Sequence, residues 1–162
     1  FLPVYPLFFV VAGTAVAEFW RRSKWLKVLS VAFLVWHAGE ALAVSPHYLA
    51  YFNEFVGGPK NGFKYLRDSN LDWGQDLKGL GVLVREKGYG RIALHYHWPA
   101  DPAYYGIDFR PIGPEETLQP RHDVYAISVH ALDGFAWTKR IPPTERVGYS
   151  IFVYDLRTAV LE

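Results

Sequence analysis

Cysteine and methionine are absent from the 162-residue sequence, and neither sign of charge is in excess, with 17 lysines and arginines against 16 aspartates and glutamates. Without cysteine there is no disulfide scaffold and no cysteine-based catalytic site. A formal net charge of +1 gives no field that would hold a polyanion, so we expect no nucleic-acid partner. Disorder is excluded as well, because 51% of the residues are hydrophobic and 17% are aromatic.

Familiar catalytic signatures are also missing. The sequence contains no nucleophile elbow, P-loop, GxGxxG or HExxH motif, so no local pattern identifies a self-contained enzyme. The chain begins at Phe1 without an initiator methionine, and we interpret it as a fragment of a longer protein.

Long uncharged runs are concentrated in residues 1–44. Residues 1–17 carry no charge, and at about 1.5 Å per residue they make roughly 26 Å of helix, close to the thickness of a hydrocarbon core. Residues 28–44 form a second run, which two polar residues interrupt. The basic cluster at 21–27 lies between the runs, and short loops rich in lysine and arginine stay in the cytoplasm. We therefore predict two transmembrane helices, with a cytoplasmic turn at 21–24 and both outer ends outside.

The remaining residues, 45–162, predict one small extracytoplasmic α/β domain. Apolar spacing favours an amphipathic helix after Pro46, running to Val56. A second helix is expected over 73–87, with Asp72 as its cap and Gln75 as the partner in a capping box. Runs rich in Ile, Val, Tyr and Phe predict strands, which cover residues 91–98, 124–131 and 148–156, with a short strand at 109–112 inside a proline-rich connection.

The densest polar cluster is DSNLDWGQD, residues 68–76. Asp68, Asn70 and Asp72 have the alternating spacing of an EF-hand calcium loop. A full EF-hand is excluded, because Trp73 and Gly79 occupy the positions that need glycine and glutamate. Three interpretations stay open: capping of the following helix, contact with a substrate, and binding of a divalent metal. We assign no metal ligand and no cofactor from this pattern.

A second group of polar and aromatic residues follows the first predicted strand. His95 and His97 lie two apart, a spacing that can chelate zinc, but two histidines without a third ligand are weak evidence. Asp101, Tyr104 and Tyr105 come next, and aromatic rings beside a carboxylate suit the faces and hydroxyls of sugars. The alternative is a turn whose tyrosine rings pack on the core.

We expect these two groups to face one cleft. The connection after the predicted helix is short, so the strand 91–98 returns toward the start of that helix. If this strand pairs beside the strand 148–156, its end brings Asp101 and Tyr104 near the polar cluster 68–76.

Three blocks of sequence resemble one family. They are PHYLAYFNEFVGGPKNGFKYLRDSNLDWGQDL at 46–77, DPAYYGI at 101–107 and RVGYSIFVYDL at 146–156, in the order that the family has them. In these blocks the chain is similar to the C-terminal section of bacterial membrane glycosyltransferases related to dolichyl-phosphate-mannose protein mannosyltransferases, glycosyltransferase family 39. FLPVYP at the start resembles the entry of one of its last membrane helices. Six residues match the most specific motif: Asp68, Asn70, Asp72, Trp73, Gln75 and Asp76.

The resemblance implies a multispanning transferase of the bacterial cytoplasmic membrane that takes a sugar from a polyprenyl-phosphate donor at the outer face. Its fold would be the membrane architecture of lipid-linked sugar transferases, followed by a small outer domain. The family's acidic catalytic residues lie in its first outer loop, which would precede this chain. We therefore expect a supporting or acceptor-facing part, inactive alone, whose partners are the lipid bilayer, the donor and an acceptor.

Two other classes compete with this interpretation. One is a membrane-tethered, non-enzymatic domain that binds carbohydrate or peptide through the cluster 68–76 and the segment DPAYYG. The other is a purely structural lid on the membrane helices. The sequence upstream of Phe1 separates them, because further spans and an acidic outer loop support the transferase, and a short start supports the tether.

Overall fold

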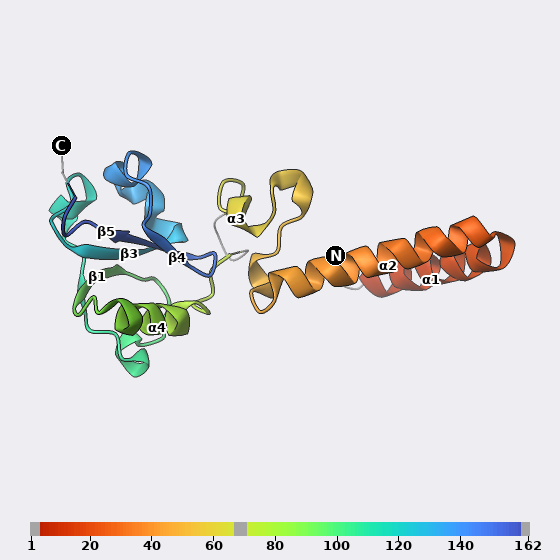
Figure 1. Cartoon of the computed structure of the whole chain (residues 1–162), viewed down its shortest axis with the longest axis horizontal. Helices are drawn as coiled ribbons and strands as arrows, with labels where there is room; N and C mark the ends of the chain where they lie inside the picture. The colour runs from red at the N-terminus through yellow and green to blue at the C-terminus, as the bar shows by residue number, and fades with distance from the viewer. Residues whose placement is uncertain (1–3, 67–70, 160–162) are drawn as a thin grey trace. The chain divides into compact units, whose positions relative to one another are not determined.

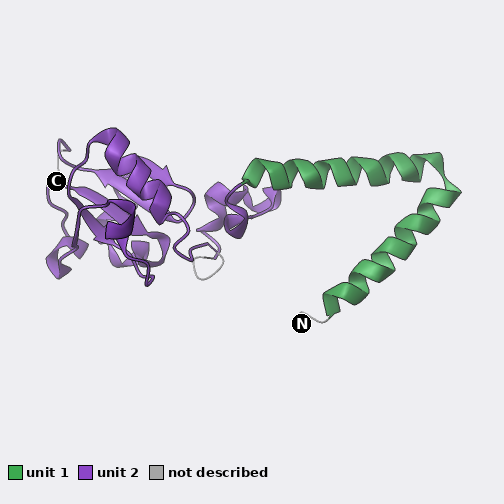
Figure 2. Cartoon of the chain, turned by 90° about the horizontal axis from the view of Figure 1, so that it is seen from below, with its two compact units in different colours: residues 1–45 green, residues 46–162 purple. Residues whose placement is uncertain are grey.

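The computed structural model describes residues 4–66 and 71–159. The chain divides into two compact units, Phe1–Ser45 and Pro46–Glu162, which are green and purple in Figure 2. They are called unit 1 and unit 2 below, and each is described by itself.

Unit 1 consists of two helices, α1 (Val4–Arg22) and α2 (Lys24–Val44). They contact each other, and they are separated by Ser23, whose extended backbone (φ −149°, ψ 136°) ends the first helix and starts the second. Almost every apolar side chain of the pair is exposed within the unit, since no residue of α1 is buried and Val44 is the buried residue of α2.

One of these helices is suited to cross a membrane. By length and composition, α2 is the single candidate span among the described residues. The shorter helix α1 carries Glu18, Arg21 and Arg22, and such charges lower the mean hydropathy of a segment. The first of the two predicted spans therefore stays a prediction.

Unit 2 is a small mixed α/β domain built on one sheet (Figure 1). Its described strands are β1 (Ile92–His95), β2 (Phe109–Pro111), β3 (Val124–Ser128), β4 (Glu145–Val147) and β5 (Ile151–Asp155). Their order is β2-β1-β3-β5-β4, in which β1 pairs parallel with both β2 and β3, while β5 pairs antiparallel with β3 and β4.

Helical elements flank the sheet. The main helix is α4 (Leu77–Lys87), and a single turn, α3 (Pro59–Gly62), precedes it. The others are short 3-10 helices: η1 (Tyr48–Ala50), η2 (Glu54–Val56), η3 (Pro102–Tyr105), η4 (Pro114–Thr117), η5 (Val129–Gly134) and η6 (Ala136–Lys139).

The two faces of the sheet carry separate hydrophobic clusters, because neighbouring residues of a strand point to opposite faces. One cluster packs under α4, which lies along that face in Figure 1, and includes Leu77, Leu80, Val84, Ile92, Leu94, Val124, Ala126, Ile151 and Val153. The other packs under η5 and η6 and includes Ala93, Tyr125, Ile127, Leu132, Phe135, Trp137, Phe152 and Tyr154. The strand β5 is covered on both sides, as its sequence predicted.

Two predicted helices differ from the structure. Residues 46–56 form the two turns η1 and η2 instead of one amphipathic helix, and Phe55 of the supposed apolar face is 93% exposed. The second helix begins at Leu77 rather than at Trp73, because Gly74 has a left-handed backbone (φ +83°) that no α-helix accommodates. The condition set for the common cleft, pairing of the strands 91–98 and 148–156, is not met, since β3 lies between β1 and β5.

Candidate functional site

A pocket of about 640 Å³ lies at the carboxyl ends of the parallel strands. His95 is the last residue of β1, Ile112 follows β2, and His130 lies in the turn that follows β3. Because the three strands run in the same direction, their ends meet at one edge of the sheet, which is where α/β sheets commonly bind ligands. The lining residues are His95, His97, Trp98, Ile112, Pro114, Thr117, His130, Ala131, Gly134 and Phe135.

Aromatic rings form one side of this pocket. The indoles of Trp73 and Trp98 are stacked, with centroids 5.1 Å apart and planes 21° from parallel. The rings of His97 and His130 both meet Trp98 edge-on, at 5.9 and 5.8 Å. Trp73 is 55% exposed, so it presents indole surface to solvent beside the pocket. Such a surface combines an apolar face with polar imidazole nitrogens.

Two buried donors near the pocket have no hydrogen-bond partner among the described residues. They are the hydroxyl of Tyr96 and the indole N–H of Trp98. Buried polar atoms are nearly always paired in folded proteins, so these two are exceptions. Trp98 lines the pocket, whereas the Tyr96 hydroxyl lies against Gly74 and is not part of the lining. Burial raises the pKa of Tyr96 to about 12, with a further contribution from Asp72, and the hydroxyl therefore keeps its proton. Partial burial lowers the pKa of His95, which favours a neutral imidazole.

Asp72 holds the segment before α4 against the sheet. Its buried carboxylate accepts a hydrogen bond from the hydroxyl of Ser128, the last residue of β3, at 2.5 Å. The second oxygen accepts the backbone N–H of Gly74 at 2.8 Å, and Nε2 of His130 lies 3.4 Å from the Asp72 carbonyl. Asp72 therefore connects the loop that carries Trp73 to the strand end at the pocket.

The same loop is closed on itself by Gln75. The backbone N–H of Trp73 donates to Oε1 of Gln75, and Nε2 of Gln75 donates to the carbonyl of Leu71, both at 2.8 Å. Gly74 is needed at the contact with the sheet, because a Cβ there would lie 2.3 Å from the Tyr96 hydroxyl oxygen. These contacts set the position from which Trp73 stacks on Trp98.

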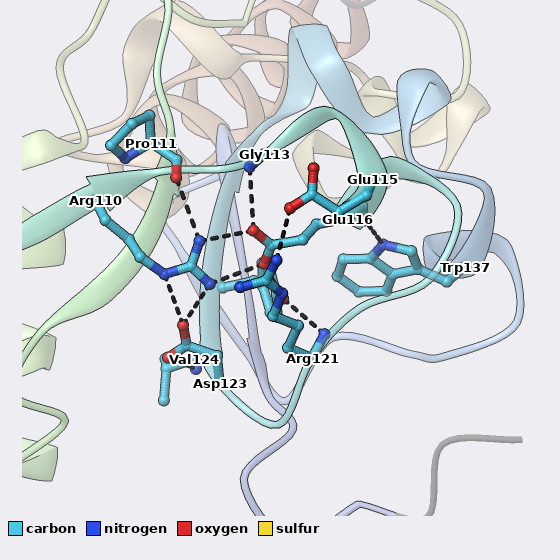
Figure 3. A network of polar contacts seen from close by, with 10 residues as sticks. Arg110, Pro111, Gly113, Glu115, Glu116, Arg121, Asp123, Val124 and Trp137 are labelled. Carbon is cyan, nitrogen blue, oxygen red and sulfur yellow. Dashed lines mark hydrogen bonds and ion pairs between the residues drawn. The ribbon is translucent and has the colours of Figure 1, made fainter.

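A network of ionic and hydrogen bonds joins Arg110, Glu116 and Asp123 (Figure 3). The segment that it holds includes Ile112, Pro114 and Thr117, which form one wall of the pocket. The guanidinium of Arg110 donates to both oxygens of Glu116 at 2.8 Å and to Oδ2 of Asp123 at 2.6 and 3.0 Å. Hydrogen bonding with Arg110, opposed by burial and assisted by the Tyr125 hydroxyl, lowers the pKa of Glu116 to about 2. The wall therefore remains charged and ordered at neutral pH.

The indole of Trp137 joins this network from the second hydrophobic cluster. Its N–H donates to the backbone carbonyl of Glu116 at 2.8 Å, and the Trp137 ring is fully buried against Tyr125 and Tyr154 (Figure 3). The proline-rich connection that the sequence predicts as irregular is thus attached to the core at a defined point.

The residues of the predicted polar cluster have different surroundings. Asp68 and Asn70 lie outside the described residues. Trp73 lies beside the pocket and Asp72 beneath it, where Asp72 is a loop anchor rather than the predicted cap of the helix. The reason is that the helix starts four residues beyond Trp73, and the Asp72 carboxylate is already occupied by Ser128 and Gly74.

Asp76 occupies the N-cap position of α4, yet its side chain points to another part of unit 2. One carboxylate oxygen accepts the N–H groups of Tyr149 and Ser150 and the Ser150 hydroxyl, at 2.8 to 3.2 Å. The other lies 3.2 Å from Nδ1 of His47. The side chain of Asp76 is therefore engaged away from the pocket.

The segment 101–105 packs beside α4. Asp101 caps η3 by accepting the N–H of Ala103 at 2.9 Å, and Tyr104 is 84% exposed. Tyr105 lies against Gly81 of α4. None of the described contacts joins Asp101 or Tyr104 to the pocket or to Asp76, so the expected common cleft gains no support.

Sequence reasoning missed several residues of the site. His130, Ser128, Tyr96 and Glu116 carried no motif. His130 lies inside the predicted strand 124–131, and only the observed end of β3 at Ser128 places it after the strand. His95 and His97 were considered for zinc, and the structure places both in the pocket. Within residues 4–66 and 71–159, no group of three His, Asp or Glu side chains is arranged to hold a metal ion.

Comparison with known proteins adds no identification. No family model, no curated protein and no solved structure matches this chain.

Proposed function

We propose that unit 2 binds carbohydrate, as the C-terminal part of a membrane glycosyltransferase that uses a polyprenyl-phosphate sugar donor at the outer membrane face. The observation that carries the proposal is the stacked pair Trp73 and Trp98, of which Trp98 lines the pocket together with three histidines. The resemblance of the sequence to glycosyltransferase family 39 supports the class of reaction.

The pocket suits a sugar for chemical reasons. A pyranose ring has an apolar C–H face that packs on an indole, and hydroxyls around its edge that need donors and acceptors. The imidazoles of His95, His97 and His130 line the pocket and offer ring nitrogens to sugar hydroxyls, and a neutral His95 offers a nitrogen acceptor. A cluster of carboxylates would favour a metal and a basic surface would favour a polyanion, and the described residues that line this pocket include neither.

In this proposal the chain positions the acceptor or the donor sugar and does not itself catalyse transfer. The acidic groups that would act on the glycosidic bond belong to the outer loop that the resemblance places upstream of Phe1. The helices of unit 1 would anchor the protein in the bacterial cytoplasmic membrane, with unit 2 outside.

A titration of the full chain in detergent micelles tests sugar binding. Methyl mannoside, glucose, galactose and N-acetylglucosamine are added separately, and tryptophan fluorescence and saturation-transfer NMR report contact. Replacing Trp98 or Trp73 by Ala should weaken binding roughly two- to tenfold, the loss expected for one aromatic stacking contact. Phe55→Ala is the matched control, because it removes an exposed ring that does not line the pocket. Absence of binding to every sugar, or equal losses in all three variants, would reject the proposal.

The alternative, a tethered carbohydrate-binding domain without transferase activity, is favoured by one observation. The described residues that line the pocket all belong to unit 2, as expected of a domain that binds sugar by itself. Transfer assays on the full-length protein with a polyprenyl-phosphate sugar separate the two functions. Transfer that falls with Trp98→Ala at unchanged protein level supports the transferase, and sugar binding without transfer supports the tether.

A further inference from the structure

A second pocket of unit 2, of about 500 Å³, is lined by positively charged side chains. His47, Lys60 and Arg146 come from three separate segments and converge on it, together with Gly148 and Tyr149. None of these residues lines the aromatic pocket. This basic pocket is therefore separate from the sugar site proposed above.

Arg146 is held in a fixed orientation beside this pocket. Its guanidinium lies over the rings of Phe152 and Phe63, 4.4 and 5.0 Å from their centroids, and Nη1 donates to the carbonyl of Lys60 at 3.1 Å. Within the described part of the chain, no carboxylate lies within ion-pair distance of the Arg146 or Lys60 side chain. Two cations thus meet at one pocket without an acidic partner of their own.

The carboxylate of Asp76 packs against the turn that carries Gly148 and Tyr149, and both of its oxygens have partners. Asp76 is buried and accepts three donors from Tyr149 and Ser150, while its other oxygen faces Nδ1 of His47. Gly148 makes this packing possible, because a Cβ there would lie 2.2 Å from the Asp76 carboxylate. Asp76 therefore supports both the 148–150 turn and His47, which lines the pocket.

We propose that His47, Lys60 and Arg146 bind a phosphate group. A guanidinium presents a planar fork that matches phosphate oxygens, and an ammonium adds a second full charge. A guanidinium and an ammonium together complement a phosphate monoester, which carries up to two negative charges, better than they complement a single carboxylate. The group is a soluble phosphate monoester or the phosphate headgroup of a lipid, and its recognition does not depend on the sugar site proposed above.

Equilibrium dialysis of the full chain in neutral detergent, with radiolabelled inorganic phosphate at fixed ionic strength, tests the site. We expect one bound phosphate per chain. The double variant Lys60→Gln/Arg146→Gln should bind about tenfold more weakly or worse, since it removes two charge-assisted contacts. The control Lys78→Gln/Arg140→Gln changes the net charge equally at exposed positions outside the pocket, and should bind as the native chain does.

Equal losses in the two double variants would mean a net-charge effect and would overturn the proposal, as would native binding by the first one. Because Arg146 also packs on two rings, the single variant Lys60→Gln provides a test that leaves this packing intact. It should weaken binding while the circular dichroism spectrum is unchanged, and full binding by this variant would reject the site.

Competition then identifies the source of the phosphate. Dihexanoyl phosphatidic acid that displaces the label at concentrations about tenfold below those of unlabelled phosphate indicates a lipid headgroup. Equal potency of glycerol phosphate and the short lipid indicates a soluble monoester. Sulfate that competes as well as either would reject recognition of phosphate in favour of a general anion effect.

Discussion

The two units use apolar residues in opposite ways. In unit 1 the large apolar side chains are exposed, and Val44 is the buried one among its described residues. In unit 2 they are collected in two clusters on either side of a sheet. The comparison teaches that unit 2 carries its own core, whereas the helices of unit 1 need an apolar environment from outside, either lipid or other helices.

The charged side chains of the two units also differ in their burial. The described ion pair of α1, between Glu18 and Arg22, is exposed and lies within one helical turn. Unit 2 instead buries Asp72, Asp76 and Glu116, each with several donors. Charges in unit 2 therefore specify tertiary structure, and the following predictions test this contrast.

The largest loss of stability is expected from Glu116→Ala, because this change removes the carboxylate that accepts two hydrogen bonds from the Arg110 guanidinium. Breaking a buried pair in this way should lower the free energy of unfolding of unit 2 by about 3 to 5 kcal/mol. Glu115→Ala is the matched control: this neighbour is 61% exposed and pairs with Arg121, so its loss should cost less than about 1 kcal/mol. Chemical denaturation followed by tryptophan fluorescence measures both, and similar values would show that the network is not a stabilising element.

The next prediction concerns membrane insertion of the helix α2 in unit 1, and the changes should leave the fold of unit 2 unaltered. If α2 crosses a membrane, Leu34→Arg places a charge near the middle of the span and should disfavour insertion by about 2.5 to 3.5 kcal/mol. Leu42→Arg, near the end of the helix, should cost much less because the side chain can reach the interface. Glycosylation mapping in microsomes reports the inserted fraction. Equal, small effects at the two positions would argue against a span.

A smaller effect is expected for the loop anchor of the aromatic pocket. Asp72→Ala should cost about 1 to 3 kcal/mol, because it leaves the buried Ser128 hydroxyl without its acceptor. The double variant with Ser128→Ala should be clearly less destabilised than the sum of the two single variants. Exact additivity in chemical denaturation would favour the helix-cap role that the sequence suggests for Asp72. Asp108→Ala, at a side chain 73% exposed, serves as the control.

The sequence predicted the secondary-structure elements more accurately than the tertiary contacts between them. The strands at 91–98, 124–131 and 148–156 were found, in shortened form, because alternation and β-branched residues report burial directly. The helix start was misplaced, since Asp72 has the local chemistry of a cap, while the left-handed backbone of Gly74 and the tertiary bond from Ser128 to Asp72 are not visible in the sequence pattern. The network behind the pocket wall was not predicted from the sequence. Arg110, Glu116 and Asp123 come together only in the folded structure, and no spacing in the sequence indicates their contacts.

The mixed direction of the sheet has a consequence for the order of folding. The strands β4 and β5 are joined by a three-residue turn and pair antiparallel, so they close a short loop at little entropic cost. The parallel pairs of β1 with β2 and β3 require long crossovers, and the Asp72–Ser128 bond joins residues 56 positions apart. Contacts of such separation form slowly. The aromatic pocket belongs wholly to the parallel half of the sheet, so the chain would acquire its β4–β5 hairpin first and its binding site last.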